Sequence, residues 1–104
     1  MDHRDGRTAV REAVRRAIDQ ALLERQVLRI EYAGTKGETT TREVEPSVFL
    51  SGRGGVSYLV AWCRLRDDVR VFRGNRIVSA EPTGERYPEP GRERLTRMGD
   101  TFDS

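Results

Sequence analysis

Residues 56–77 read Val-Ser-Tyr-Leu-Val-Ala-Trp-Cys-Arg-Leu-Arg-Asp-Asp-Val-Arg-Val-Phe-Arg-Gly-Asn-Arg-Ile, and this stretch decides the fold. From Val56 to Cys63 the side chains on both faces of an extended chain are mostly apolar. This pattern is typical of a strand covered on both sides, so we expect it to be the central strand. Asp67 and Asp68 favour a turn, after which residues 69–73 return antiparallel. The resulting hairpin crowds five arginines into one small region: Arg64, Arg66, Arg70, Arg73 and Arg76.

The residues around this hairpin predict further strands joined by tight turns. Residues 27–32 alternate between apolar and polar side chains, as a half-buried strand does. Residues 39–50 favour one long strand that bends at Pro46, because proline cannot donate a ladder hydrogen bond. The glycine-rich residues 51–55 are interpreted as a plain hairpin turn, with a phosphate-binding nest as the alternative.

After the hairpin, residues 76–80 predict a short last strand that ends before Pro82. Residues 82–91 have the composition of turns and linkers. Together, the predicted short strands and their hairpin connections favour a mainly β fold with a small barrel.

The N-terminal part predicts one amphipathic helix over residues 8–24. Thr8 is a suitable N-cap, and Glu12 and Arg16 are spaced for an ion pair on the wet face. One apolar stripe follows the helical period: Val10, Val14, Ile18 and Leu22, with Ala13, Ala17 and Ala21 beside them. We expect this stripe to cover an open end or face of the barrel; the alternative is pairing with the same helix of another chain.

Length and composition allow one domain with a lean core. The chain has 104 residues, 36% hydrophobic and 35% charged, with a net charge of +2. We expect residues 1–7 to be disordered, residues 8–87 to form the domain with its barrel in residues 27–81, and residues 88–104 to be a polar tail with short helical turns near residues 92–98. So small a net charge does not by itself indicate a nucleic-acid partner. The evidence for such a partner has to come from local clustering of basic residues.

The residue inventory argues against catalysis and metal binding. The single histidine, His3, lies in the N-terminal segment, apart from any serine or cysteine that it could activate. One histidine and one cysteine cannot build a transition-metal site, and no cofactor is expected. Glu43 and Glu45 share one strand face and could act as a carboxylate pair, but a solvated face is the better interpretation. We therefore expect a protein that is not an enzyme.

Cysteine usage and hydropathy indicate a cytoplasmic protein. Cys63 has no second cysteine to pair with and lies in an apolar strand, so it is interpreted as a small buried side chain in a reducing compartment. No stretch approaches the roughly 18 apolar residues of a membrane span, and no signal peptide is evident. We expect no contact with membranes.

Three strings carry a resemblance to a known family: Ser57-Tyr58-Leu59, Val60-Ala61-Trp62-Cys63-Arg64 and Arg70-Val71-Phe72-Arg73-Gly74-Asn75-Arg76-Ile77. They resemble the WYL domain family, in which a Trp-Tyr-Leu triplet opens a core strand and an Arg-x-Phe-Arg-Leu-Asp-Arg-Ile string closes the motif. The likeness extends upstream and covers roughly residues 10–87. Ser57 replaces the usual tryptophan, and Gly74-Asn75 replaces Leu-Asp, which removes an aromatic surface and a carboxylate. The resemblance implies a five-stranded Sm-like or SH3-like barrel with an N-terminal helix.

Members of this family are ligand-sensing modules, usually fused to helix-turn-helix domains in bacterial regulators of DNA-damage responses and phage defence, and several bind single-stranded nucleic acid. The resemblance therefore implies a role in transcription regulation and a ligand that is single-stranded nucleic acid or a nucleotide-like anion. Carried over to this sequence, the candidate contacts are Tyr58, Arg64, Arg70, Arg73 and Arg76, with Ser47 as a weaker candidate. Because the residues before the first strand hold only one helix, we expect a stand-alone or excised module that works with a DNA-binding partner protein.

The residues leave a second class of function open. Arginine binds phosphate and stacks on rings, and aromatic side chains can stack on unpaired bases. Yet Trp62 and Phe72 are better interpreted as core residues, and the arginines could simply solvate a barrel edge. A regular strand also places Arg70 on the side of Phe72 and Arg73 on the opposite side. The competing hypothesis is a protein–protein interaction module, such as a homodimerisation surface, without a ligand of its own.

Overall fold

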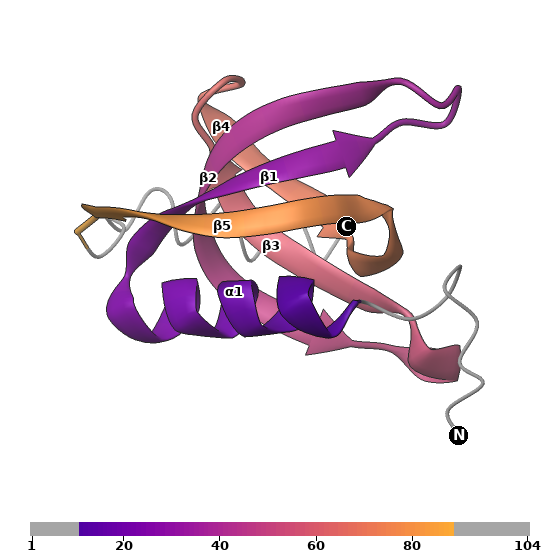
Figure 1. Ribbon diagram of the computed structural model, residues 1–104, viewed down its shortest axis with the longest axis horizontal. Coiled ribbons are helices and arrows are strands. Elements are labelled where there is room, and N and C mark those ends of the chain that lie inside the picture. Colours follow the sequence, from indigo (N-terminus) through magenta and orange to yellow (C-terminus); the bar gives the residue numbers. More distant parts are fainter. Residues whose placement is uncertain (1–10, 89–104) are drawn as a thin grey trace.

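The computed structural model describes residues 11–88, which form one α-helix and five strands (Figure 1). In chain order the elements are α1 (Glu12–Glu24), β1 (Gln26–Ala33), β2 (Thr39–Ser51), the 3-10 turn η1 (Arg53–Gly55), β3 (Ser57–Cys63), β4 (Asp68–Arg73), the 3-10 turn η2 (Gly74–Arg76) and β5 (Ile77–Arg86). The predicted class, mainly β with an N-terminal helix, is confirmed. The predictions for residues 1–7, for Thr8 and for the chain beyond Pro88 lie outside the described residues. No helix within them is long and apolar enough to cross a membrane.

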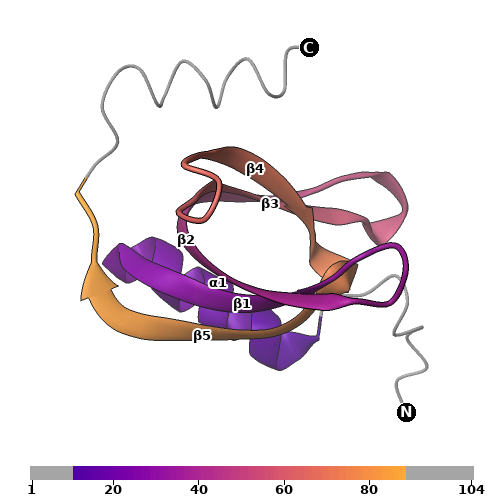
Figure 2. The same cartoon turned by 90° about the horizontal axis from the view of Figure 1, so that it is seen from above.

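The strands form one antiparallel sheet that curls into a small barrel (Figure 2). The first half of β2 pairs with β1 and its second half pairs with β3, so this one strand joins the two sides of the barrel. The pairing register of β2 slips between Pro46 and Val48, which is the bulge that the proline predicts. A bulge raises the local twist, and the bend that results lets a single sheet wrap around its own core.

The central strand is β2 and not β3, which corrects the expectation from the sequence. The strand order is β4-β3-β2-β1-β5, so β3 lies next to an edge strand. The predicted burial of β3 on both faces is confirmed, since every residue of Leu59–Cys63 is buried. An apolar pattern reports what lies above and below a strand, whereas its place in the sheet depends on its lateral partners.

Helix α1 packs on the barrel, as its apolar stripe predicts. It lies along β5 and also contacts β1 and β2 (Figure 1). Its buried side chains are Val14, Ala17, Ile18 and Ala21. The helix begins at Glu12, after Arg11 in extended conformation, and so begins later than the sequence predicts. It ends at Arg25, whose left-handed conformation (φ 53°) turns the chain into β1.

The last strand is longer than the sequence predicts. β5 runs from Ile77 to Arg86 and pairs with β1 over much of that length, with Pro82 opposite Leu28. The expected end before Pro82, and the barrel boundary at residue 81, are therefore wrong. Proline is tolerated here because β5 is an edge strand, where one side of the backbone has no partner strand.

One apolar core joins the helix to the inner face of the barrel. The buried residues that form it are Val14, Ala17, Ile18, Ala21, Leu28, Ile30, Val44, Leu59, Ala61, Cys63, Phe72 and Ile77. Phe72 and Cys63 are thus core residues, as expected, and Trp62 is also buried, although on the opposite face of β3. Burying this much of a lean sequence in one cluster supplies most of the stability that a domain of this size needs.

Tyr87 fastens the end of the described chain to the barrel. Its N–H donates to the carbonyl of Arg25, and its hydroxyl donates to the carbonyl of Pro46. Burial, together with the smaller effect of the charge of Glu45, raises the pKa of Tyr87 to about 12 against the opposing effect of Arg25. Tyr87 therefore fixes the end of β5 to the start of β1 and to the bend of β2.

Candidate ligand-binding surface

Tyr58 and Arg73 are brought together by the register of the β3–β4 hairpin. They lie directly opposite each other on β3 and β4, so their side chains share one face of the sheet. This is the outer face, because Leu59 and Phe72, the next pair along, belong to the core. Tyr58 is half-buried and Arg73 is exposed. The pair therefore presents an aromatic ring beside a guanidinium at the barrel surface.

The backbone under Arg73 is held by Tyr32 of β1, a residue that the sequence analysis did not select. The hydroxyl of Tyr32 accepts a hydrogen bond of 3.0 Å from the N–H of Arg73. The Tyr32 ring packs edge-on against Phe72, with ring centroids 5.1 Å apart. Tyr32 thus joins β1 to the end of β4 and fixes where the Arg73 side chain begins.

Arg76 lies on η2, the turn that follows Arg73. Gly74, which precedes Asn75 on this turn, has no side chain that could keep a ligand from the backbone, but it is buried. Close approach to the backbone at Gly74 is therefore not available, and any contact has to come from the arginine side chains. Arg73 is exposed and Arg76 is half-buried, so both guanidiniums can reach solvent from this turn.

A further arginine, which the sequence analysis did not select, lies near the same end. The Tyr58 ring lies against Gly52, where a Cβ atom would be 3.6 Å from Cε2 of the ring. Arg53, the next residue, is exposed on η1. The pairing of Ser51 with Ser57 creates this proximity. The sequence could have pointed to Arg53 through the hairpin turn predicted at residues 51–55, because a short turn places its residues next to the strand that follows.

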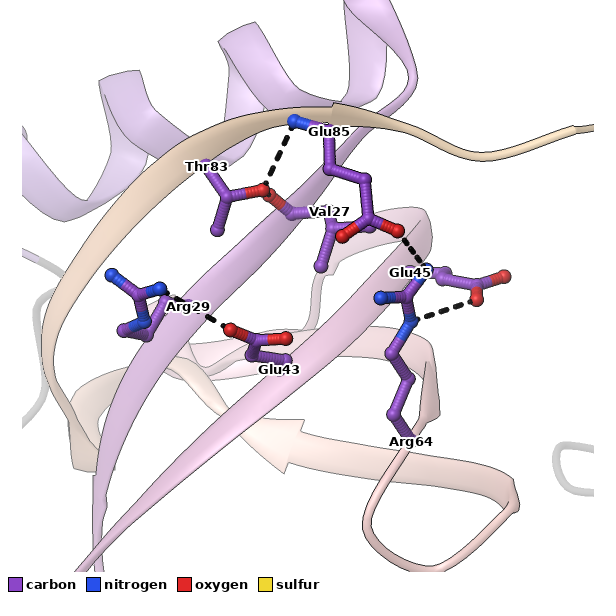
Figure 3. A network of polar contacts seen from close by, with 7 residues as sticks. All are labelled: Val27, Arg29, Glu43, Glu45, Arg64, Thr83 and Glu85. Carbon is purple, nitrogen blue, oxygen red and sulfur yellow. Dashed lines mark hydrogen bonds and ion pairs between the residues drawn. The ribbon is translucent and has the colours of Figure 1, made fainter.

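Arg64 lies at the other end of the hairpin and is engaged in ion pairs. Its Nε is 3.2 Å from Glu45, and its Nη2 is 2.8 Å from Glu85 (Figure 3). The hydrogen bond to Glu85 raises the pKa of Arg64 against the opposing effect of burial. The same bond lowers the pKa of Glu85. Arg64 therefore joins β2 to β5, and the sequence could not show this because Glu85 was assigned to a linker.

The remaining two candidates lie apart from the Tyr58–Arg73 pair. Arg70 is exposed and pairs with Ala61, whose side chain points to the core, so it lies on the other face of β4 from Arg73. Ser47 is exposed at the bulge of β2. The six predicted residues are thus not one groove: Tyr58, Arg73 and Arg76 gather at one end, whereas Arg64, Arg70 and Ser47 lie elsewhere.

Charge pairing separates the two ends of the hairpin. Within residues 11–88, no ion pair joins Arg53, Arg73 or Arg76 to a carboxylate. Other arginines are paired with carboxylates: Arg29 with Glu43 of β2 at 3.2 Å, and Arg64 with Glu45 of β2 and Glu85 of β5 (Figure 3). We call the side chains of Arg53, Tyr58, Arg73 and Arg76 the basic end. Among the described residues no cluster of three or more His, Cys, Asp and Glu side chains could hold a metal ion.

A five-stranded antiparallel sheet curled into a small barrel, with a helix on one side, defines a small β-barrel domain of the SH3-like kind. The chain belongs to the WYL domain family, whose sequence model matches residues 13–82.

Relatives of known name share this region. The chain is 44% identical over 78 residues to Protein PafC of Mycobacterium tuberculosis and 35% identical over 75 residues to the uncharacterized HTH-type transcriptional regulator YobV of Bacillus subtilis. These matches cover 74% and 72% of this chain, but only 22% of each relative. Among solved structures, proteasome accessory factor B/C (PafBC) of Arthrobacter aurescens matches with a TM-score of 0.66 and 35% identity, over 71% of this chain and 12% of that one.

Proposed function

We propose that this domain is a non-enzymatic, ligand-sensing regulatory module whose ligand is single-stranded nucleic acid or a nucleotide-like anion. The observation that carries the proposal is the pairing of Tyr58 with Arg73 on the outer face of β3 and β4. A base can stack on the half-buried ring while the neighbouring guanidinium binds a phosphate. Such recognition needs neither a metal nor a cofactor.

The arginines of the basic end have their charge available for a ligand. An arginine without a carboxylate partner can bind a phosphate through two parallel hydrogen bonds without first losing another contact. Arg53, Arg73 and Arg76 meet this condition among the described residues, whereas Arg64 would have to give up Glu45 and Glu85. We therefore assign ligand contact to the basic end and a structural role to Arg64.

The names of the relatives support a regulatory setting. One is called an HTH-type transcriptional regulator, and the solved structure is of a protein called PafBC. We infer that this domain serves a cytoplasmic bacterial regulator, in transcription regulation linked to the DNA-damage response or phage defence. A DNA-binding domain or partner protein would supply promoter recognition, since this domain matches only 22% of the length of these relatives.

A protein–protein interaction module is the second candidate, and two exposed leucines favour it. Leu23 on α1 is 84% exposed, and Leu65 in the turn between β3 and β4 is 69% exposed. Either could contact a partner protein or a second copy in a homodimer. Single exposed leucines are common on protein surfaces, so this support is weaker than that for the basic end.

A salt titration separates the two candidates. Fluorescence anisotropy of labelled oligo(dT), and of the matching RNA, would be measured with the full chain at several salt concentrations. If the basic end binds phosphates, affinity falls steeply with salt, because the arginines release counterions from the nucleic acid. Absence of binding at low salt, together with a stable dimer in sedimentation, would reject the ligand-sensing proposal and favour the interaction module.

Substitutions then test whether the basic end is a specific site. Arg73→Ala and Arg76→Ala should each weaken binding by about 1–3 kcal/mol and reduce the salt slope by roughly one phosphate. Arg16→Ala is the matched control, because Arg16 is exposed on α1 and its substitution removes the same charge. Equal weakening by all three variants would reduce binding to diffuse electrostatics.

A further inference from the structure

The turn η2, which follows Arg73 and carries Arg76, is attached at both of its ends to one residue of β1. Before the turn, the N–H of Arg73 donates a hydrogen bond of 3.0 Å to the hydroxyl of Tyr32. After the turn, Ile77 pairs with Tyr32 in the β1–β5 ladder. Within residues 11–88, β1 and β4 are not neighbours in the sheet, so the contact with Arg73 is made by a side chain and not by strand pairing. The hydroxyl and the backbone of Tyr32 together hold the two ends of η2.

The direction of the Arg73 N–H also determines how close its side chain lies to Tyr58. In an antiparallel ladder, a residue whose N–H points away from its partner strand belongs to a non-hydrogen-bonded pair. The Cα atoms of such a pair are about 4.5 Å apart, and the side chains lie closer together than in the hydrogen-bonded pairs. Arg73 faces Tyr58 in this way, because its N–H points to Tyr32 on β1. The bond to Tyr32 therefore favours the arrangement in which the guanidinium and the Tyr58 ring can act on one ligand.

The ring of Tyr32 fixes the position of its hydroxyl. The ring packs edge-on against Phe72, with centroids 5.1 Å apart and an interplanar angle of 78°. Phe72 is buried in the core, so the ring that carries the hydroxyl rests on a rigid part of the fold. Replacing Tyr32 by phenylalanine keeps this packing and every charge, and removes only the acceptor for the Arg73 N–H. The substitution frees one end of η2.

We propose that Tyr32 is a positioning residue that gives the basic end its preference for strands that carry bases over strands that carry phosphates alone. This inference rests on the proposed function and specifies which ligands the same site prefers. A base on Tyr58 and a phosphate on Arg73 are bound at the same time only when the two side chains are held side by side, whereas a phosphate alone needs only the arginine. If η2 is freer, the competent arrangement is less populated, and the apparent affinity for a base-carrying strand falls by the same factor.

Two labelled strands of equal length separate the two kinds of contact: oligo(dT) and a base-free strand of abasic deoxyribose phosphate. The native domain should bind oligo(dT) at least about fivefold more tightly, because a stacked base adds to the affinity. Tyr32→Phe should weaken binding of oligo(dT) roughly threefold to tenfold, as expected when one hydrogen bond is lost. Its affinity for the base-free strand and its salt slope should equal those of the native domain, since no charge is removed.

Tyr87→Phe is the matched control, because it removes another tyrosine hydroxyl that bonds to the backbone, at Pro46 of β2 and not at η2. It should leave the preference for oligo(dT) unchanged. Amide hydrogen exchange gives a measurement that needs no ligand: the N–H of Arg73 should exchange several-fold faster in Tyr32→Phe than in the native domain. Urea unfolding of each variant shows that the domain remains folded.

The outcomes distinguish this inference from the proposed function. If the native domain does not bind oligo(dT) at low salt, the proposed function is rejected and this inference with it. If the native domain binds oligo(dT) and Tyr32→Phe binds it equally well, only this inference is overturned. Equal losses for both strands in Tyr32→Phe, equal affinity of the native domain for both strands, or unchanged exchange at Arg73 would overturn it as well.

Discussion

Replacing Ile18 by alanine tests whether α1 is part of the folded unit. Ile18 has no exposed surface and lies in the cluster that joins the helix to the barrel. The substitution removes three carbons, and each buried methylene contributes about 0.8 kcal/mol. The cavity left behind adds to this loss to the extent that the core does not relax. The free energy of unfolding should therefore fall by about 2–4 kcal/mol.

Urea and thermal denaturation measure this effect. The midpoint of urea unfolding should fall with little change in slope, since a similar surface is exposed on unfolding. The melting temperature should fall by about 4–8 °C for each kcal/mol lost, for a domain of this size. Leu23→Ala is the matched control, because Leu23 lies on the same helix and is 84% exposed. It should change stability by no more than about 0.5 kcal/mol. A similarly small effect of Ile18→Ala would refute the docking of the helix.

Two further substitutions test the polar contacts. Tyr87→Phe removes a phenol whose pKa is raised to about 12, so the stability that this group contributes is complete below about pH 10 and is lost as the pH rises through 12. Between pH 10 and 12, the free energy of unfolding should therefore fall by about 2 kcal/mol more in the native protein than in the variant. Parallel curves of stability against pH would contradict this. Arg64→Ala breaks the ion pairs with Glu45 and Glu85 and should cost about 0.5–1.5 kcal/mol of stability, with oligonucleotide affinity unchanged. A loss of affinity as large as that of the basic-end variants would show instead that Arg64 contacts the ligand.

Much of the fold could be predicted from the sequence because burial in this domain is periodic. Helix α1 and the middle of strand β1 bury side chains at the spacing of their own structure, whereas β3 is buried continuously, as its apolar run predicts. The bend at Pro46 was likewise predictable, since it follows from one missing hydrogen-bond donor. The start of α1 at Glu12, after Arg11 in extended conformation, was not predicted, because no residue near Glu12 gives a helix-start signal that stands out in the sequence.

The length of β5 and the role of Arg64 depended on tertiary context. Pro82 reads as the end of a strand unless the strand is known to lie at a sheet edge. Because the last strand was predicted to end before Pro82, Glu85 was assigned to a linker, and its ion pair with Arg64 could not be predicted. The pairing of Tyr58 with Arg73 depends on the hairpin register, which the sequence suggests through its turn but does not define.

Within residues 11–88 the strand order places β4 and β5 at the edges of the sheet, and each edge is unsuited to adding another strand. β4 carries charged side chains at Asp68, Arg70 and Arg73, and β5 carries Pro82, with Gly84 in a left-handed conformation (φ 87°). Charges, proline and local irregularity are the features by which open sheets avoid edge-to-edge aggregation. Copies of this domain can therefore be crowded together at high concentration without their sheets merging into fibrils.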